Sequence, residues 1–327
     1  MTFAEEENEA GGAMRIGLVV DSACDLPPDF IERHRIQILP VTVHLDGHDL
    51  VDTRDTATTL DFYRRHLCAK GDAATSPQTV EQIKQLFLSK LVLDYDFVFC
   101  ITIASGRSPI YDHATQASFA IINEYKPIRA AANLSGHFSL RVIDSQNLFA
   151  GQGIAAVEAV RMIASGQTNT NKMRERLDQI ASNTYGYMVP RDLHYLRVRG
   201  KTKGDRSVGW VGATLGTMLD IKPLLRAYRN ETGPVAKLRH FDDVVSKLFG
   251  YVVRRVDAGL LTPTVCLSYG GELEEMRKLP GYASLIKLCK EREIEVLESL
   301  MSVTGAINVG EGALAVAFAA EPHELDL

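Results

Sequence analysis

The apolar residues in the first half of the chain fall into short continuous runs separated by amphipathic stretches. The runs that suit a buried strand cover 15–20, 36–43, 97–103 and 140–143. Runs of this kind, without polar alternation, are typical of strands covered on both faces of a parallel sheet. Apolar residues at helical spacing lie between them, over 59–67, 77–91 and 149–164. The pattern predicts an α/β domain built on a parallel sheet.

The pattern changes after the small polar stretch 166–169, which is the expected domain boundary. The strands predicted beyond it cover 185–189, 221–226, 235–239, 264–268, 294–297 and 313–319. Asn230-Glu231-Thr232-Gly233 separates two of these strands and predicts an antiparallel hairpin. We expect an α+β domain with a mixed or antiparallel sheet over 167–327, after an α/β domain over 14–166 and a disordered acidic tail over 1–13.

The loop that follows the run 97–103 has the composition of an anion site. Ser105, Gly106, Arg107 and Ser108 lie directly before Pro109. Ser108 suits a helix N-cap, and proline suits the first helical position because it has no N–H to leave unpaired. Helix N-termini favour negative groups. The loop is therefore predicted to hold the negative head of a small ligand.

Three other predicted strand ends carry hydroxyl groups: Asp21-Ser22, Thr75-Ser76 and Asp144-Ser145. Ligands of open α/β sheets bind outside the carboxyl ends of the strands. Their recurrence predicts one shared site at that edge of the sheet. Ser76 precedes Pro77 and is predicted to open a helix, so capping alone is the other interpretation of Thr75 and Ser76. Gly151, early in the helix 149–164, indicates close packing or ligand approach.

Composition and charge exclude several classes of protein. The chain has 327 residues, 46% of them hydrophobic, and a net charge of −5, which argues against a general nucleic-acid binder. No apolar run approaches the ~20 residues that span a bilayer, so no stable membrane insertion is expected. The five cysteines show no C-x-x-C spacing, which is typical of reduced thiols in a cytoplasmic protein.

No metal or cofactor site is expected. His44, His48 and Asp49 could be imagined as metal ligands, but the Asp46-Gly47 turn explains these residues without a fourth ligand. The chain has no phosphate-binding P-loop and no nucleophile elbow. We expect no catalytic residue in the chain itself.

Motifs in a fixed order resemble the DegV family of bacterial two-domain proteins that bind fatty acids. The resemblance extends from about Arg15 to Ala319. The matching stretches are Val20-Asp21-Ser22 with Asp25-Leu26-Pro27, Val41 to Gly47, Thr75-Ser76, Ser105-Gly106 with Ser108, Val142 to Ser145, Gly151 with Gly153, Leu193 with Tyr195-Leu196, Leu219 with Ile221 to Leu225, and Gly312 to Phe318.

This resemblance implies a long-chain fatty acid bound between the domains, with the second domain covering it. It implies Thr75 and Ser105 as the main contacts of the carboxylate, with the other binding residues around them. Those other residues are Ser76, Gly106 and Ser108. Asp21, Ser22 and Gly151, from the strand ends and the helix above, complete the candidate ligand-binding residues. The bound fatty acid is the only ligand expected, without a cofactor.

Some members of the family present their fatty acid to a separate fatty acid kinase, and the resemblance implies that partner here as well. Lys201 and Tyr269 occupy the positions of an arginine and a histidine that assist the transfer. Arg107 and Pro109 replace the usual leucine and glycine of the central loop. Arg107 could pair with a more anionic head group. An enzyme or regulator acting on a small phosphorylated or carboxylated metabolite at the same loops is therefore the alternative function.

Overall fold

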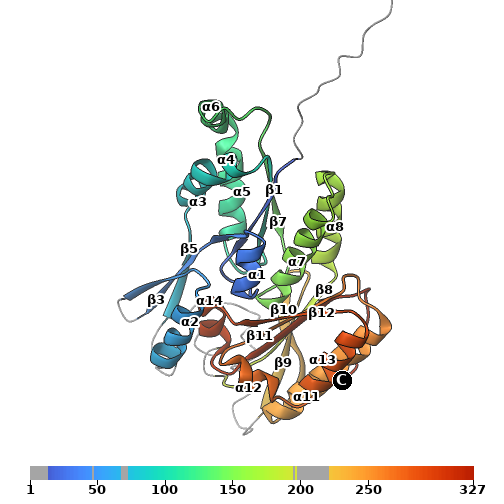
Figure 1. The fold of residues 1–327 in the computed structure, drawn as a ribbon. Helices are drawn as coiled ribbons and strands as arrows, with labels where there is room; N and C mark the ends of the chain where they lie inside the picture. Colours follow the sequence, from blue (N-terminus) through green and yellow to red (C-terminus); the bar gives the residue numbers. More distant parts are fainter. Residues whose placement is uncertain (1–13, 46–47, 68–72, 194–195, 197–220) are drawn as a thin grey trace, which may run out of the picture.

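Three β-sheets organise the protein in a computed structural model, which describes residues 14–45, 48–67, 73–193, 196 and 221–327 (Figure 1). The expected acidic tail 1–13 and Lys201 lie outside these residues. The first sheet is parallel, with strand order β2-β1-β6-β7. Its strands are β1 (Ile16–Asp21), β2 (Gln37–Leu39), β6 (Phe97–Thr102) and β7 (Ser139–Asp144). The predicted parallel sheet is confirmed.

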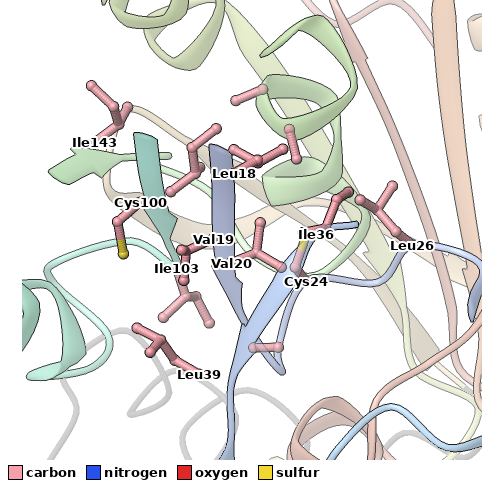
Figure 2. Close-up of a cluster of buried hydrophobic side chains, with 14 of the residues drawn as sticks. Leu18, Val19, Val20, Cys24, Leu26, Ile36, Leu39, Cys100, Ile103 and Ile143 are labelled. Carbon is pink, nitrogen blue, oxygen red and sulfur yellow. The ribbon is translucent and has the colours of Figure 1, made fainter. Parts of the chain in front are cut away.

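The centre of this sheet is buried because its two middle strands, β1 and β6, are apolar on both faces. Val19 and Val20 of β1, and Cys100 and Ile101 of β6, are fully buried. Figure 2 shows Val19 and Val20 of β1 and Cys100 of β6 in this core, with Leu26 and Ile36 beside β1. Burial on both faces explains why these runs lack polar alternation.

The predicted strand 36–43 is in fact two strands in different sheets. β2 ends at Leu39 and β3 (Val41–Leu45) begins after Pro40, which has no N–H for a ladder. β3 pairs antiparallel with β4 (His48–Asp52), the strand beyond the expected Asp46-Gly47 turn, and with β5 (Ala73–Pro77). Together these three strands form a small antiparallel sheet.

The prediction that Ser76 and Pro77 open a helix is wrong. Both residues lie in the edge strand β5, and helix α3 (Val80–Leu86) begins three residues later. Thr79 is its N-cap and forms a capping box with Gln82. Pro77 is tolerated in the strand because an edge strand leaves one side unpaired.

The largest sheet is mixed, as predicted, with strand order β10-β9-β8-β13-β11-β12. Its strands are β8 (Thr184–Val189), β9 (Ile221–Tyr228), β10 (Glu231–Arg239), β11 (Thr264–Tyr269), β12 (Glu295–Leu300) and β13 (Leu314–Ala319). β11 and β12 are parallel, and the other pairs are antiparallel. The predicted hairpin is β9 and β10, joined by Arg229 and Asn230, both with positive φ. Such angles suit a two-residue hairpin turn.

Helix α7 (Ala150–Ala164) lies between the two large sheets. It packs against β1 and β6 on one side and against β8, β11 and β13 on the other. Glycine and alanine at Gly151, Gly153, Ala155, Ala156 and Ala159 allow both sheets to approach its backbone. The hydrophobic core is therefore continuous across the boundary predicted after residue 166, and that boundary stays a prediction.

The remaining helical segments pack around the sheets (Figure 1). In chain order they are α1 (Pro28–Arg33), α2 (Thr56–Phe62), η1 (Tyr63–Leu67), η2 (Phe87–Leu91), α4 (Val92–Asp94), α5 (Ile110–Ala120), η3 (Ile121–Asn123), α6 (Tyr125–Ala131), α8 (Thr170–Ser182), α11 (Phe241–Ala258), α12 (Leu273–Arg277), α13 (Tyr282–Glu291) and α14 (Val303–Val309). Within the described residues, none of these helices has the length and apolar character needed to cross a membrane.

Candidate ligand site at the carboxyl ends of the parallel strands

Three of the four predicted polar strand ends do meet at one edge. β1, β6 and β7 are adjacent and parallel, and they end at Asp21, Thr102 and Asp144. The loop with Ser105 follows β6. The fourth segment, Thr75-Ser76, reaches the same region from another sheet. The carbonyl of Gln78, just after β5, lies 2.7 Å from Nδ1 of His113 on α5.

Ser105 is bonded to Asp144 at the end of the neighbouring strand. Its hydroxyl donates to Asp144 Oδ2 at 2.6 Å, and its backbone N–H donates to Oδ1 at 3.2 Å. Asp144 also accepts from the Gln146 backbone at 2.8 Å and from Asn230 Nδ2 at 2.9 Å. The carboxylate of Asp144 thus joins the central loop to the β9–β10 turn of the other sheet. Sequence reasoning treated Asp144 only as a strand end and Asn230 only as a turn residue.

The rest of the central loop is held against the same hairpin. A Cβ on Gly106 would lie 3.6 Å from the carbonyl oxygen of Asn230. Arg107 donates from Nη2 to the carbonyl of Thr232 at 3.4 Å. Ser108 Oγ accepts from the backbone N–H of Ile110 at 3.3 Å. The prediction that Ser108 is the N-cap is off by one residue, because α5 begins at Ile110 and Pro109 occupies its N-cap without a side-chain bond.

Asp21 and Ser22 are fully buried, and their polar atoms bind the chain itself. Asp21 accepts from the backbone N–H groups of Ile103, at 2.6 Å, and Ala23, and from the side chain of Gln152. Ser22 Oγ accepts from the backbone N–H of Val41 at 3.0 Å. These contacts position the start of the central loop and the start of β3. The predicted contact of Asp21 and Ser22 with a ligand stays a prediction.

Asp21 should make stability depend on pH. Burial raises the pKa of Asp21 from 3.8 to about 6, although its three hydrogen bonds oppose the shift. The folded state then binds a proton more tightly than the unfolded state. The free energy of unfolding should fall between about pH 4 and pH 6, by about 3 kcal/mol from this group.

Urea unfolding of the wild type and of Asp21→Asn between pH 4 and pH 7 measures this contribution. Asparagine does not titrate, so the wild type should lose stability relative to the variant as the pH rises. A difference that stays constant or grows with pH would contradict the expectation.

Thr75 and Ser76 point to opposite faces of the small sheet, because successive side chains alternate along a strand. Thr75 lies opposite Val43, which packs with Val303 and Ile307 of α14, so Thr75 faces the protein interior. Ser76 lies opposite Thr42 on the outer, exposed face. The structure therefore places these two neighbours in different surroundings.

Ser76 belongs instead to a polar row on the outer face. His44 Nε2 lies 2.8 Å from Ser76 Oγ, and His44 Nδ1 lies 2.6 Å from Asp49 Oδ1. This order of groups can activate a serine hydroxyl. However, the Asp49 and His44 side chains are 67% and 40% exposed. Water therefore competes for every group in the row. We interpret the row as a cross-strand contact.

Gly151 is required by close packing. A Cβ on Gly151 would lie 1.9 Å from Asn147 Oδ1, and one on Gly186 of β8 would lie 2.2 Å from the same atom. Asn147 Nδ2 donates to the carbonyls of Thr184 and Ala227, at 2.8 and 3.1 Å. Asn147 therefore joins the β7–α7 loop to β8 and β9. Close packing was one of the two interpretations of Gly151, and a contact with ligand stays a prediction.

Tyr269 is not at a surface. Its side chain is 1% exposed in the core beneath α11 and α13, and burial raises its pKa. Lys201, the other residue predicted to assist transfer, lies outside the described residues. Because its side chain is buried, Tyr269 is not available for a surface contact with a partner in this structure.

A buried ion pair that sequence reasoning missed joins the two halves of the molecule. Arg54 Nη1 lies 3.4 Å from Asp25 Oδ1, and both side chains are almost fully buried. Arg54 also donates to the Ser299 hydroxyl and the Leu300 carbonyl, each at 2.8 Å. Asp25 Oδ1 accepts from the backbone of Ser302 at 2.8 Å. Burial raises the pKa of Asp25, and the positive charge of Arg54 opposes that shift.

One cavity of about 740 Å³ lies apart from these loops. It runs along α1, from Pro28 and Ile31 to Arg15 and Tyr95, which precede β1 and β6. Arginine, lysine and carboxylate side chains share its lining. Such a surface does not suit an apolar chain.

Comparison with known proteins identifies the family. The family model described as an uncharacterised protein of the DegV family matches residues 15–321. A DegV domain-containing protein of Xanthomonas axonopodis pv. citri is 60% identical over 311 residues, which are 95% of this chain and 99% of that protein. The chain belongs to the DegV family.

Solved structures of DegV-family proteins share this fold along almost the whole chain. DegV of Bacillus subtilis, described as a fatty acid binding protein, has a TM-score of 0.72 and 20% identity, covering 94% of this chain and 100% of that one. A stearic acid-binding protein of Eubacterium ventriosum has a TM-score of 0.74 and 21% identity, covering 93% and 98%. The predicted family and the predicted fold class are both confirmed.

Proposed function

We propose that this DegV-family chain binds a long-chain fatty acid and acts as its carrier. The observation that supports the proposal is a family match over residues 15–321, with a fold shared by proteins described as fatty-acid-binding. The carboxyl end of the fatty acid would lie at the loops that end the parallel strands. The acyl chain would be buried between the two predicted domains.

Thr75 and Ser105 are the head-group contacts in this proposal. Thr75 faces inward from β5, and Ser105 is partly exposed at the end of β6. The junction of β5 with α3 contacts α5, the helix that follows Ser105, which supports placing both hydroxyls in one site. Ser108 and Gly106 would shape the loop, while Asp21 and Ser22 hold it in place.

The acyl chain and the carboxyl group of the ligand would contribute differently to the binding free energy. Each buried methylene contributes roughly 0.8 kcal/mol, so a long acyl chain supplies on the order of 10 kcal/mol before association costs. A hydroxyl contact contributes about 1 kcal/mol and mainly fixes orientation. The acyl chain therefore supplies most of the affinity, and the loops fix the orientation of the bound ligand.

In this proposal the chain performs no chemistry on its ligand and can present it to a fatty acid kinase. Lysine at position 201 keeps a positive charge but lacks the two-pronged geometry of arginine. Arg107, in the central loop, donates to the carbonyl of Thr232. Both residues are proposed to face such a partner.

Native mass spectrometry after gentle purification tests the function. A co-purified fatty acid of roughly C14–C18 length supports it. A co-purified phosphate ester would support the alternative, an enzyme or regulator that binds a small phosphorylated metabolite at the same loops, with Arg107 as an anion contact. Removal of lipid followed by calorimetric titration with a fatty acid gives the affinity.

Replacing Thr75 or Ser105 with alanine should weaken binding of a fatty acid roughly three- to tenfold, because each change removes about 1 kcal/mol of polar contact. Ser139→Ala, at the exposed opposite end of β7, is the matched control and should bind like the wild type. Calorimetric titration measures the affinities, and circular dichroism checks the fold. Unchanged affinity in both variants would remove the head-group assignment.

A further inference from the structure

The hydroxyl hydrogen of Ser105 is already used inside the protein. A serine hydroxyl has one hydrogen to donate and two lone pairs that accept. Ser105 donates that hydrogen to Asp144 Oδ2 at 2.6 Å, the short distance of a hydroxyl-to-carboxylate bond. Toward a ligand, Ser105 Oγ then presents only lone pairs. Within the described residues, no group donates to this oxygen.

Asp144 is surrounded in the way that suits an ionised carboxylate. Oδ1 accepts from the backbone N–H groups of Ser105 and Gln146, at 3.2 and 2.8 Å. Oδ2 accepts from the Ser105 hydroxyl and from Asn230 Nδ2, at 2.6 and 2.9 Å. All four partners are donors. If the Ser105 hydrogen rotated toward a ligand, Oδ2 would lose its shortest bond.

This arrangement does not match an ionised fatty acid. A carboxylate has only acceptor atoms, so Ser105 Oγ and a ligand carboxylate would face each other lone pair to lone pair. A neutral carboxyl group has one acceptor and one donor. Its O–H can donate to Ser105 Oγ, while its carbonyl accepts from Thr75, whose hydroxyl is not engaged by another described residue.

We propose that the Ser105–Asp144 pair selects the fatty acid in its neutral, protonated form, so that binding takes up a proton from solution. The inference rests on the proposed function, because Ser105 must contact the head group. The only bond that changes is the ligand's O–H bond. It forms with a proton from solvent when the acid binds, and it breaks again when the acid leaves and ionises. Asp144 acts through Ser105 and is a positioning residue.

The charged groups around the pair are engaged elsewhere or point to solvent. Arg107 donates to the Thr232 carbonyl from the same loop. Arg229, beside the turn, donates to the carbonyl of Ser182. On α5, His113 contacts the carbonyl of Gln78 and Asp112 is exposed. Glu231, at the start of β10, is exposed as well.

Calorimetric titration with dodecanoic acid at about pH 8, in Tris and in phosphate, measures the protons exchanged on binding. In water at this pH the acid is ionised, because carboxyl pKa values lie at about 4–5. We expect uptake of about one proton per ligand, and an affinity that falls about tenfold for each pH unit above neutrality. Dodecyl alcohol, which can both donate and accept without ionising, should bind with an affinity that does not change with pH.

The variant Asp144→Asn tests the role of the pair. An asparagine amide at this position can donate to Ser105 Oγ and free the hydroxyl hydrogen for the ligand. Proton uptake should then vanish, and the variant should bind dodecanoic acid more tightly than the wild type at about pH 8. Asp49→Asn, an exposed aspartate on the outer face of the small sheet, is the matched control and should keep the wild-type uptake.

The outcomes are distinguishable. Binding without proton uptake and with a pH-independent affinity would overturn the neutral-acid inference and leave the proposed function intact. Failure of both the acid and the alcohol to bind the lipid-free wild type would overturn the proposed function and the inference with it. If Asp144→Asn does not fold, the buffer comparison on the wild type still decides between uptake and no uptake.

Discussion

Replacing Gly151 with alanine should lower the free energy of unfolding by roughly 3–5 kcal/mol. The new methyl group would lie 1.9 Å from Asn147 Oδ1, which is far inside contact distance. Asn147 would have to leave its position between the β7–α7 loop and the second sheet. Its loss would leave the buried carbonyls of Thr184 and Ala227 without the amide donor that binds both. Urea denaturation measures the effect.

Gly250→Ala is the matched control for this substitution. Gly250 is also a glycine inside a helix, α11, but the nearest atom to its added Cβ is the end of the Arg254 side chain at 3.8 Å. This change should raise stability by roughly 0.5–1 kcal/mol, because alanine loses less backbone entropy in a helix. Equal effects of the two substitutions would mean that helix propensity, and not Asn147, decides the result.

Replacing Arg54 with methionine should lower the free energy of unfolding by roughly 3–5 kcal/mol. The substitution leaves the carboxylate of Asp25 buried without its positive partner, and it removes the hydrogen bonds from Arg54 to Ser299 and Leu300. These bonds connect the β4–α2 loop of the first half of the chain with the β12–α14 segment of the second. Thermal and urea unfolding measure the loss.

The exposed pair Arg33 and Asp29 on α1 provides the comparison for Arg54. Their side chains are 65% and 72% exposed, so Arg33→Ala should cost less than about 0.5 kcal/mol. The double variant Arg54→Met, Asp25→Leu should recover much of the stability, because it buries no unpaired charge. A double variant as unstable as Arg54→Met alone would show that lost packing, and not the unpaired carboxylate, causes the effect.

Much of the fold could be predicted because its signals are local. The run 97–103 predicts a strand buried on both faces, and the structure places it at the centre of the parallel sheet. Asn230 and its neighbours predict the hairpin of the second sheet. The errors at Ile36–Val43 and at Ser76-Pro77 have one cause. A proline ends a strand or occupies an edge strand as readily as it opens a helix, and only the neighbouring chain distinguishes these roles.

The sequence by itself determined the family, the two kinds of sheet and the polar ends of the parallel strands, because periodicity and short motifs are properties of contiguous residues. The tertiary structure decided which polar groups remain available to a ligand. Asp21 and Ser22 bind the backbone of distant loops, Thr75 and Ser76 face opposite ways, and Ser105 gives its hydrogen to Asp144. The sequence shows that a hydroxyl group is present but not which acceptor receives its hydrogen. Folding decides that, because the one hydrogen goes to the acceptor that lies nearest.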